Sequence, residues 1–148
     1  MKYVEVYKNN NEYATFPSIL YLNETNEVII AFRVAGEFSL KSSRAKNPTH
    51  HDNESKCCIL ISSDGGNSFN IKNTRVVTDL DDGINDPAIS ILSNGDLILR
   101  NTVVEVKKTS NKQEMYSQFL AHRPELGTVS GIVGLTIQIS KDKGRNWS

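Results

Sequence analysis

Two stretches of the chain share one pattern: ILISSDGGNSF at residues 59–69 and IQISKDKGRNW at residues 137–147. Each is an apolar, β-branched run followed by Ser-x-Asp-x-Gly-x-x-aromatic. At this spacing a short hydroxyl and a carboxylate can accept the free backbone N–H groups of a tight turn. The Gly supplies a positive φ, and the aromatic ring folds back as a buried plug. The pattern predicts two equivalent hairpin turns, built by Ser62, Asp64, Gly66 and Phe69 and by Ser140, Asp142, Gly144 and Trp147.

A second repeat supports the first. FPSILYL at residues 16–22 aligns with DPAISIL at residues 86–92, and each is followed by a turn and another apolar run. A repeat of this length made of strands and turns is typical of a propeller or another β-array. We therefore expect strands at 18–22, 27–33, 57–62 and 69–77 in the first unit, an acidic connector at 78–87, and strands at 88–92, 96–106 and 133–140 in the second.

The Ser-x-Asp-x-Gly-x-x-Trp/Phe turn resembles the Asp-box, or bacterial neuraminidase (BNR) repeat, of the sialidase superfamily, and the similarity runs over roughly residues 15–147. The resemblance implies an all-β fold, the six-bladed β-propeller. Blades of this kind take about 40–50 residues, so residues 1–148 would form one fragment of two four-stranded antiparallel blades. We expect blade one at about 15–77 and blade two, which is incomplete, at about 86–148.

Turns of an up-and-down blade alternate between its two ends, so the long connections should gather opposite the Asp-boxes. These are residues 34–56, 78–87 and 107–130, and a ligand pocket is expected where they meet. Within the third connection the spacing of Met115, Tyr116, Phe119 and Leu120 predicts a short amphipathic helix. Residues 127–134 are predicted to be flexible or tightly turned.

The first candidate site residues are His51 and Asp52, which precede the first Asp-box. In sialidases the catalytic acid/base is an Asp in this same loop, so the resemblance implies that role for Asp52. A carboxylic acid can protonate a departing glycosidic oxygen when it is desolvated. The alternative is a solvated loop Asp. His51 is assigned to the substrate-binding group, with a surface loop position as the alternative.

Three more residues are assigned to substrate binding: Arg33, Asp86 and Arg100. Arg33 closes a strand, so we expect it at the pocket rim, where its guanidinium suits a carboxylate bidentately. The alternative is a salt bridge at the rim with Glu37 or Asp52. Arg100 occupies the matching region of the second unit. The stretch Asn85-Asp86-Pro87 resembles one that enters the second blade of sialidase-like proteins, where a polar side chain can face the pocket.

The sequence also departs from the family. Sialidases open with Phe/Tyr-Arg-Ile-Pro, whose Arg is the first of three that hold the substrate carboxylate, and Thr15 stands in its place here. A neutral hydroxyl contributes about 1 kcal/mol in a hydrogen bond, against about 1.5–3 kcal/mol for a charged donor. The other two Arg, the nucleophilic Tyr and its Glu partner come from later blades in the family. The isolated chain is therefore expected to be inactive.

Two functions remain from different classes. The first is a sialidase-like glycoside hydrolase segment that acts on glycans, and the alternative is a non-catalytic Asp-box propeller module that binds a glycan or a protein. The exposed strands at both ends of two blades also predict self-association through blade edges, and three copies would complete six blades.

Composition excludes several partners and cofactors. The 17 basic and 17 acidic residues give no basic field for nucleic acid or membrane. Residues 1–6 lack the apolar core of a signal peptide, which leaves a cytoplasmic location as the expectation.

Cys57 and Cys58 are adjacent on a predicted strand, so they should pack on opposite faces rather than form a disulfide. The acidic stretch 79–87 does not match an EF-hand, and neither a metal site nor a cofactor is predicted, with a looser calcium site at this stretch as the alternative.

Overall fold

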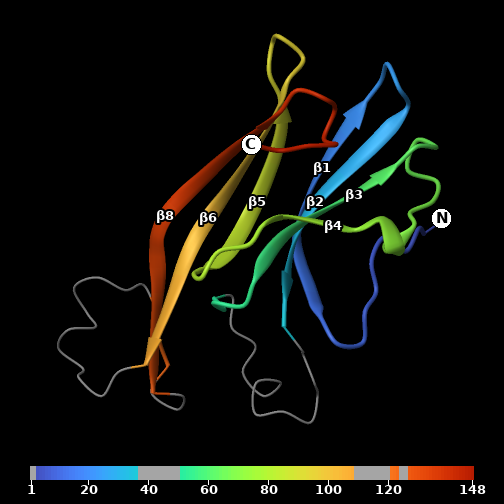
Figure 1. Ribbon diagram of the computed structural model, residues 1–148. Helices are drawn as coiled ribbons and strands as arrows, with labels where there is room; N and C mark the ends of the chain where they lie inside the picture. Colours follow the sequence, from blue (N-terminus) through green and yellow to red (C-terminus); the bar gives the residue numbers. More distant parts are fainter. Residues whose placement is uncertain (1–2, 37–50, 109–120, 124–126) are drawn as a thin grey trace.

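The computed structural model describes residues 3–36, 51–108, 121–123 and 127–148, with the backbone alone for 121–123. Two antiparallel sheets of four strands each make up this part (Figure 1). Sheet one has the order β1-β2-β3-β4, from β1 (Tyr13–Leu22), β2 (Glu27–Ala35), β3 (Lys56–Ser62) and β4 (Arg75–Thr78). Sheet two has the order β5-β6-β8-β7, from β5 (Gly83–Ile91), β6 (Leu97–Lys108), β8 (Thr128–Ser140) and β7 (Ala121–Arg123). The all-β prediction is confirmed, whereas closure into a propeller stays a prediction.

The two sheets begin with the same irregularity. In β1 the register against β2 shifts between Thr15 and Ser18, and in β5 the register against β6 shifts between Asn85 and Ala88. The residue before each Pro has a positive φ, 52° at Phe16 and 44° at Asp86. A residue other than Gly adopts this conformation at a cost that the surrounding structure must offset. The shared bulge makes the two sheets structural repeats at the positions that the Pro-containing motif indicates.

Several predicted boundaries are wrong. The outer strand predicted at 69–77 is only β4, because Phe69 packs on the core and Asn70 caps a 3-10 turn, η1 (Ile71–Asn73). The connector predicted at 78–87 ends early, since the bulge lets β5 begin at Gly83. Residues 128–134 are not a turn but the start of β8, which pairs along the whole length of β6. The helix predicted at Met115–Leu120 lies outside the described residues.

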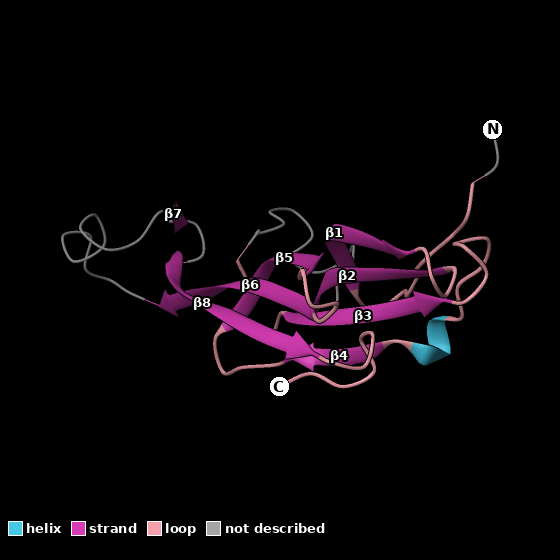
Figure 2. Ribbon diagram, turned by 90° about the horizontal axis from the view of Figure 1, so that it is seen from above, coloured by secondary structure: helices cyan, strands magenta, loops and turns pink. Residues whose placement is uncertain are grey.

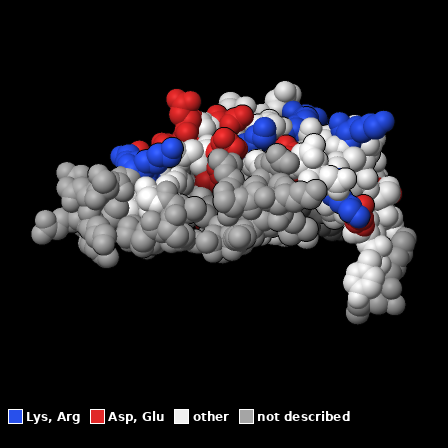
Figure 3. All heavy atoms as spheres, turned by 90° about the horizontal axis from the view of Figure 1, so that it is seen from below, with Lys and Arg blue, Asp and Glu red and all other residues white. Residues whose placement is uncertain are grey.

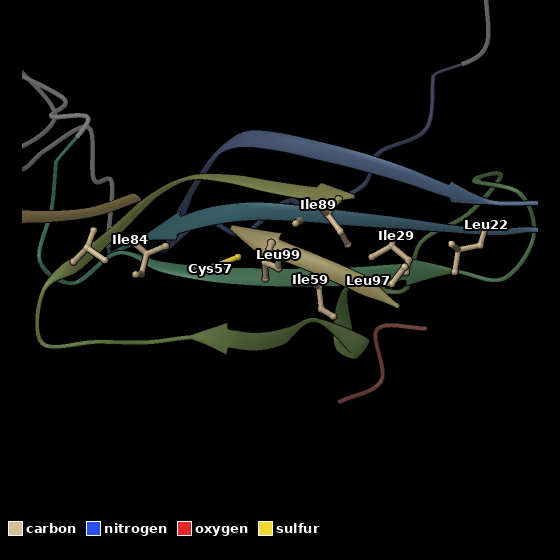
Figure 4. Close-up of a cluster of buried hydrophobic side chains, with 10 residues drawn as sticks. Leu22, Ile29, Cys57, Ile59, Ile84, Ile89, Leu97 and Leu99 are labelled. Atoms are coloured by element: carbon tan, nitrogen blue, oxygen red, sulfur yellow. The ribbon is translucent and has the colours of Figure 1, made fainter. Parts of the chain in front are cut away.

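The main core lies between the sheets. It contains Leu22, Ile29, Ala31, Cys57 and Ile59 from sheet one and Ile84, Ile89, Leu97, Leu99 and Val103 from sheet two (Figure 4). Strand β5 is the part of sheet two that lies against β1, β2 and β3 (Figure 2). A second cluster, of Ile30, Phe32, Val34, Cys58 and Leu60, covers the other face of sheet one and packs against Val6 and Tyr7. Burial of this much apolar surface stabilises the fold by about 25 cal/mol per Å² removed from water.

The adjacent cysteines belong to different cores, Cys57 to the main one and Cys58 to the second. Both are free thiols, which agrees with the packing role that the sequence predicts. Burial raises the pKa of Cys57 to about 12 and that of Cys58 to about 11. Two neighbouring residues of one strand therefore occupy separate apolar environments.

The two Ser-x-Asp-x-Gly turns, called Asp-box turns below for their sequence pattern, have matching hydrogen bonds. Ser62 Oγ donates to Asp64 Oδ1 (2.5 Å) and accepts from the Gly66 N–H (3.0 Å), and Ser140 Oγ does the same with Asp142 (2.8 Å) and the Gly144 N–H (2.8 Å). The Asp oxygens then accept backbone N–H groups further on, from Ser68 in the first turn and from Arg145 and Asn146 in the second. Gly66 and Gly144 have φ values of 84° and 83°.

These hydrogen bonds hold both carboxylates ionised. The bonds from Ser62 and Ser68 lower the pKa of Asp64, and those from Asn146 and Ser140 lower the pKa of Asp142 to about 2. Hydrogen bonds to the charged form of a carboxylate have this effect because protonation would break them. The aromatic residues differ: Phe69 packs on the second core and Trp147 on the main core.

Candidate functional site

The two ends of the sheets carry different kinds of connection (Figure 1). At one end, which we call the Asp-box end, the first Asp-box touches the β1–β2 turn through the Gly65 N–H and Asn26 O (2.9 Å). The second Asp-box reaches the same turn, since Arg145 forms an ion pair with Glu27. The starts of β3, β5 and β8 and the end of β6 meet at the other end, which we call the loop end.

A short segment, residues 51–55, ties the sheets together at the loop end. Ser55 Oγ accepts the Ile84 N–H (3.0 Å) and lies 2.9 Å from Ile84 O. Asn53 bonds both backbone groups of Val106, through Nδ2 (3.0 Å) and Oδ1 (2.7 Å). His51 Nδ1 lies 2.8 Å from Ser130 Oγ. The segment before β3 is therefore fixed to β5, β6 and β8 of sheet two.

Gly83 allows this docking. A Cβ at position 83 would lie 1.9 Å from Asp52 O, so any larger residue would force the segment away from β5. Asp52 O also accepts the Ser55 N–H (3.0 Å) and the Ser55 hydroxyl (2.5 Å). The Asp52 side chain is half-buried, and its Oδ1 accepts the Glu54 N–H (2.9 Å). The backbone at Asp52 is therefore held by its hydrogen bonds with Ser55 and by its close approach to Gly83.

Arg33 lies within β2 and is fully buried, with 0% of its surface exposed, rather than at the rim where the sequence places it. The reason is that β2 continues to Ala35, beyond the predicted end at 33. Arg33 Nε donates to Ile84 O (3.1 Å), but neither Nη1 nor Nη2 has a hydrogen-bond partner among the described residues. Burial lowers the pKa of the Arg33 guanidinium, and the charges of Asp52, Tyr13 and Asp86 oppose this effect.

Two further buried oxygens, one of Thr15 and one of Asn85, lack a hydrogen-bond partner in the described part of the chain. Thr15 pairs with Arg33 in the β1–β2 register, and its Oγ1 is buried and unbonded within the described part of the chain. Asn85 follows Ile84, whose carbonyl accepts the hydrogen bond from Arg33. Its Oδ1 is also buried and has no partner in the described part of the chain. Thr15 and Asn85 occupy equivalent positions, one residue before the positive φ of each bulge. We call Arg33, Asp52, Asp86, Thr15 and Asn85 the polar cluster.

The predicted site residues fall into two groups. The charges of Asp52 and Asp86 act on the Arg33 guanidinium, and Asp86 is exposed at the bulge. Arg100 is not the counterpart of Arg33: it is exposed and pairs with Ala88, whereas the bulge register makes Thr102 the equivalent of Arg33. His51 lies in the docked segment, bonded to β8.

Sequence reasoning missed the residues that hold the cluster. Ser55, Asn53 and Gly83 have no motif of their own, because their partners lie on another sheet. Thr15 and Asn85 could have been found, since the two x-Pro motifs mark the bulges that place them.

In Figure 3, which views the molecule from below, acidic side chains gather near the middle of the surface that is not grey. No group of three metal-ligating side chains occurs among the described residues.

No helix in the described part of the chain is long and apolar enough to cross a membrane. No family model matches the chain, and no curated protein matches its sequence. Among solved structures, the chain is similar to the crystal structure of an unknown function protein from Dyadobacter fermentans DSM 18053, with 21% identity and a TM-score of 0.76. The match covers 98% of this chain and 37% of that one. The chain thus spans little more than a third of that protein's length, and the likeness shows the shared fold alone.

Proposed function

We propose that this chain is a segment of a sialidase-like propeller that acts on glycans, with the polar cluster as its part of the substrate site. The observation that carries the proposal is the buried Arg33, whose two terminal nitrogens lack partners in the described part of the chain. An unsatisfied buried donor costs about 1–3 kcal/mol, and more when it is charged. A carboxylate or another anionic group would satisfy both nitrogens at once, because the guanidinium fork suits bidentate bonding.

Asp52 is proposed as the acid/base of the site. Its place in the loop before β3 is the place that the sialidase resemblance implies, and its charge acts on Arg33. The docked segment provides the rigidity that a general acid needs, since Ser55 and Gly83 fix the backbone at Asp52. In this proposal Asp52 protonates the leaving oxygen as the glycosidic bond breaks, and a nucleophile expected from later blades attacks the anomeric carbon. Arg33 holds the anionic group of the sugar.

The cluster differs from the family pattern in its second donor. Thr15 pairs with Arg33 and provides a hydroxyl where sialidases provide an Arg. An anionic sugar held by one guanidinium and neutral groups from Thr15 and Asn85 is the ligand that this set fits. We therefore propose acidic sugars in general as the ligand class, without a preference for sialic acid.

Because the isolated chain is expected to lack turnover, the direct test is binding. Ligand-observed NMR would compare N-acetylneuraminic, glucuronic and galacturonic acids with neutral galactose. Saturation transfer is expected to the acids only, and to disappear in Arg33→Met. Arg100→Met is the matched control, since Arg100 is exposed and outside the cluster. Equal signals for acidic and neutral sugars, or binding that survives Arg33→Met, would contradict the assignment of Arg33.

The alternative function is a module that binds glycans or proteins without turnover. Thr15 favours it, because loss of a guanidinium weakens the hold on a carboxylate in the transition state as well as in the ground state. Activated glycosides assayed with the longest natural form of the protein separate the two. Turnover that falls at least 100-fold in Asp52→Asn with unchanged binding supports the hydrolase, and binding without turnover supports the module.

A further inference from the structure

A pocket with a cationic lining lies at the Asp-box end, between sheet one and the second Asp-box turn. It has a volume of about 390 Å³ and is lined by Ile61, Lys72, Asn73, Thr74, Arg75 and Arg145. Three of these side chains are cationic and none is acidic. The first five belong to β3, η1 and β4 or to the link between the last two, and Arg145 belongs to the turn after β8. The pocket is therefore formed by two parts of this chain rather than by the outer face of one sheet.

The local sequence fixes the backbone on the sheet-one side of this pocket. Asn70 Oδ1 accepts the Lys72 N–H (3.1 Å) and caps η1, which is the cyan turn beside β4 in Figure 2. Thr74 then closes the turn, since its N–H (3.1 Å) and its hydroxyl (2.7 Å) both donate to Ile71 O. Lys72 is thus held on a fixed turn that leads directly into Arg75, the first residue of β4.

The two arginines of the pocket are held by hydrogen bonds within the chain. Arg75 Nη2 donates to Gly144 O (2.7 Å) and Nη1 donates to Arg145 O, so this side chain joins sheet one to the second Asp-box turn. Arg145 forms the ion pair with Glu27 and also donates to Lys143 O (2.7 Å). These bonds fix both guanidinium groups, so a ligand would not have to order them on binding.

Other donors of the pocket are not used within the described part of the chain. Lys72 Nζ, Asn73 Nδ2 and Arg75 Nε make no hydrogen bond there. Glu27 neutralises Arg145, but no acidic side chain among the described residues pairs with Lys72 or Arg75. The pocket therefore has an excess of positive charge, which attracts anions. A planar carboxylate suits a single guanidinium fork, whereas a tetrahedral oxyanion can accept from separate donors on several sides.

We propose that this pocket binds a tetrahedral oxyanion, a phosphate or a sulfate, either as the free ion or as an ester on a sugar. Lys72 and Arg75 Nε hold the oxygens from the side of sheet one, and Arg145 adds the charge of the opposite wall. The site lies at the other end of the sheets from the polar cluster and takes a different ligand class, so it does not rest on the glycan proposal. Because the ion would contact both walls, its binding should also raise the thermal stability by mass action.

The test is an NMR titration of the nitrogen-labelled chain, read from the backbone amides and the Arg Nε–H groups. The probes are inorganic phosphate, inorganic sulfate, galactose-6-sulfate and neutral galactose, each against chloride at equal ionic strength. Saturable shifts are expected with the anions at residues 72–75 and at Arg145, and none with galactose. Binding of the sulfated sugar as well as the inorganic ions assigns an ester site, and binding of the inorganic ions alone assigns a free-ion site.

Two variants should change the affinity in opposite directions. Lys72→Gln removes a cation whose ammonium group makes no bond among the described residues, so phosphate should bind about tenfold more weakly to a folded chain. Glu27→Gln removes the carboxylate that pairs with Arg145, so phosphate should bind more tightly. Lys141→Gln is the matched control and should bind as the unmodified chain does, because Lys141 is exposed in the same Asp-box turn but does not line the pocket.

Several results would overturn the proposal. Shifts that do not saturate, or that chloride reproduces, would reduce the effect to general screening of charge. Equal weakening in Lys72→Gln and Lys141→Gln would exclude the pocket as the place of binding. Phosphate binding that disappears in Arg33→Met would place the ion in the polar cluster instead, whereas the proposed site should keep its affinity in that variant. Circular dichroism checks folding, and if Glu27→Gln unfolds, the comparison of Lys72→Gln with Lys141→Gln decides the result alone.

Discussion

The two ends of the molecule differ in how fully their polar groups are hydrogen-bonded. At the Asp-box end, Ser62, Asp64 and their counterparts each make at least two hydrogen bonds, to one another and to backbone N–H groups. At the loop end, Thr15, Arg33 and Asn85 keep buried polar atoms without partners among the described residues. One further such atom, Asn101 Oδ1, lies between the ends in a side chain whose Nδ2 makes two bonds. A satisfied set of polar groups supports the fold, whereas each unsatisfied buried group needs an explanation, and the acidic sugar proposed above is one.

The largest effect is expected at the junction that creates the loop end. Gly83→Ala places a Cβ 1.9 Å from Asp52 O and must displace the docked segment. We expect a loss of about 3 kcal/mol in the free energy of unfolding, measured with urea. Gly134→Ala is the control, because a Cβ there meets only ordinary contacts at 3.8 Å. Equal losses in both variants would show that the segment is not held by close packing.

Arg33→Met should raise stability. The change removes an unpaired buried charge and keeps most of the side-chain volume. The Ser55 hydroxyl lies 2.9 Å from Ile84 O and can turn to donate to it after Nε is lost. We expect a gain of about 1–3 kcal/mol, measured with urea, together with loss of binding to acidic sugars. A loss of stability would mean that Arg33 supports the fold, and the contrast between the two ends would then fail.

Substitutions at the Asp-box end should lower the free energy of unfolding, whereas Arg33→Met raises it. The loss should be similar in the two turns. Ser62→Ala and Ser140→Ala each leave one backbone N–H, that of the half-buried Gly66 or the buried Gly144, without its acceptor. Each should cost about 1–2 kcal/mol. Thermal unfolding of the two variants measures the effect. Unlike costs would show that the two turns are not equivalent supports, despite their matching bonds.

The smallest effect is a dependence of stability on pH. The pKa of Asp142 falls to about 2 in the folded chain from an ordinary value of 3.8, and that of Asp64 is lowered as well. A lowered folded pKa stabilises the protein above the unfolded pKa, and this contribution is lost as the pH falls through the folded value. Urea unfolding should therefore show a decline from about pH 4 toward pH 2. The double variant Asp64→Asn, Asp142→Asn should show a flatter profile over the same range.

Local patterns predicted the fold well where a residue's partners are near in sequence. The Asp-box bonds join residues within four positions of one another, and the x-Pro motifs lie directly at the bulges. The candidate site was harder because its contacts cross between sheets. Arg33 reads as a rim residue at the end of an apolar run, and only the pairing of β2 with β1 and β3 shows that it is buried. Likewise, nothing near Ser55 or Asn53 in sequence indicates their bonds to Ile84 and Val106.

The position of Cys57 and Cys58 gives the molecule a built-in reporter of its own motions. Because Cys57 is packed between the sheets and Cys58 against the second core with Val6 and Tyr7, an alkylating reagent is expected to reach Cys57 when the sheets separate and Cys58 when the N-terminal segment lifts from sheet one. Neighbouring thiols on one strand thus record two different opening events. Mass spectrometry of singly labelled chains would rank the events by rate, and it would show which layer of the protein gives way first.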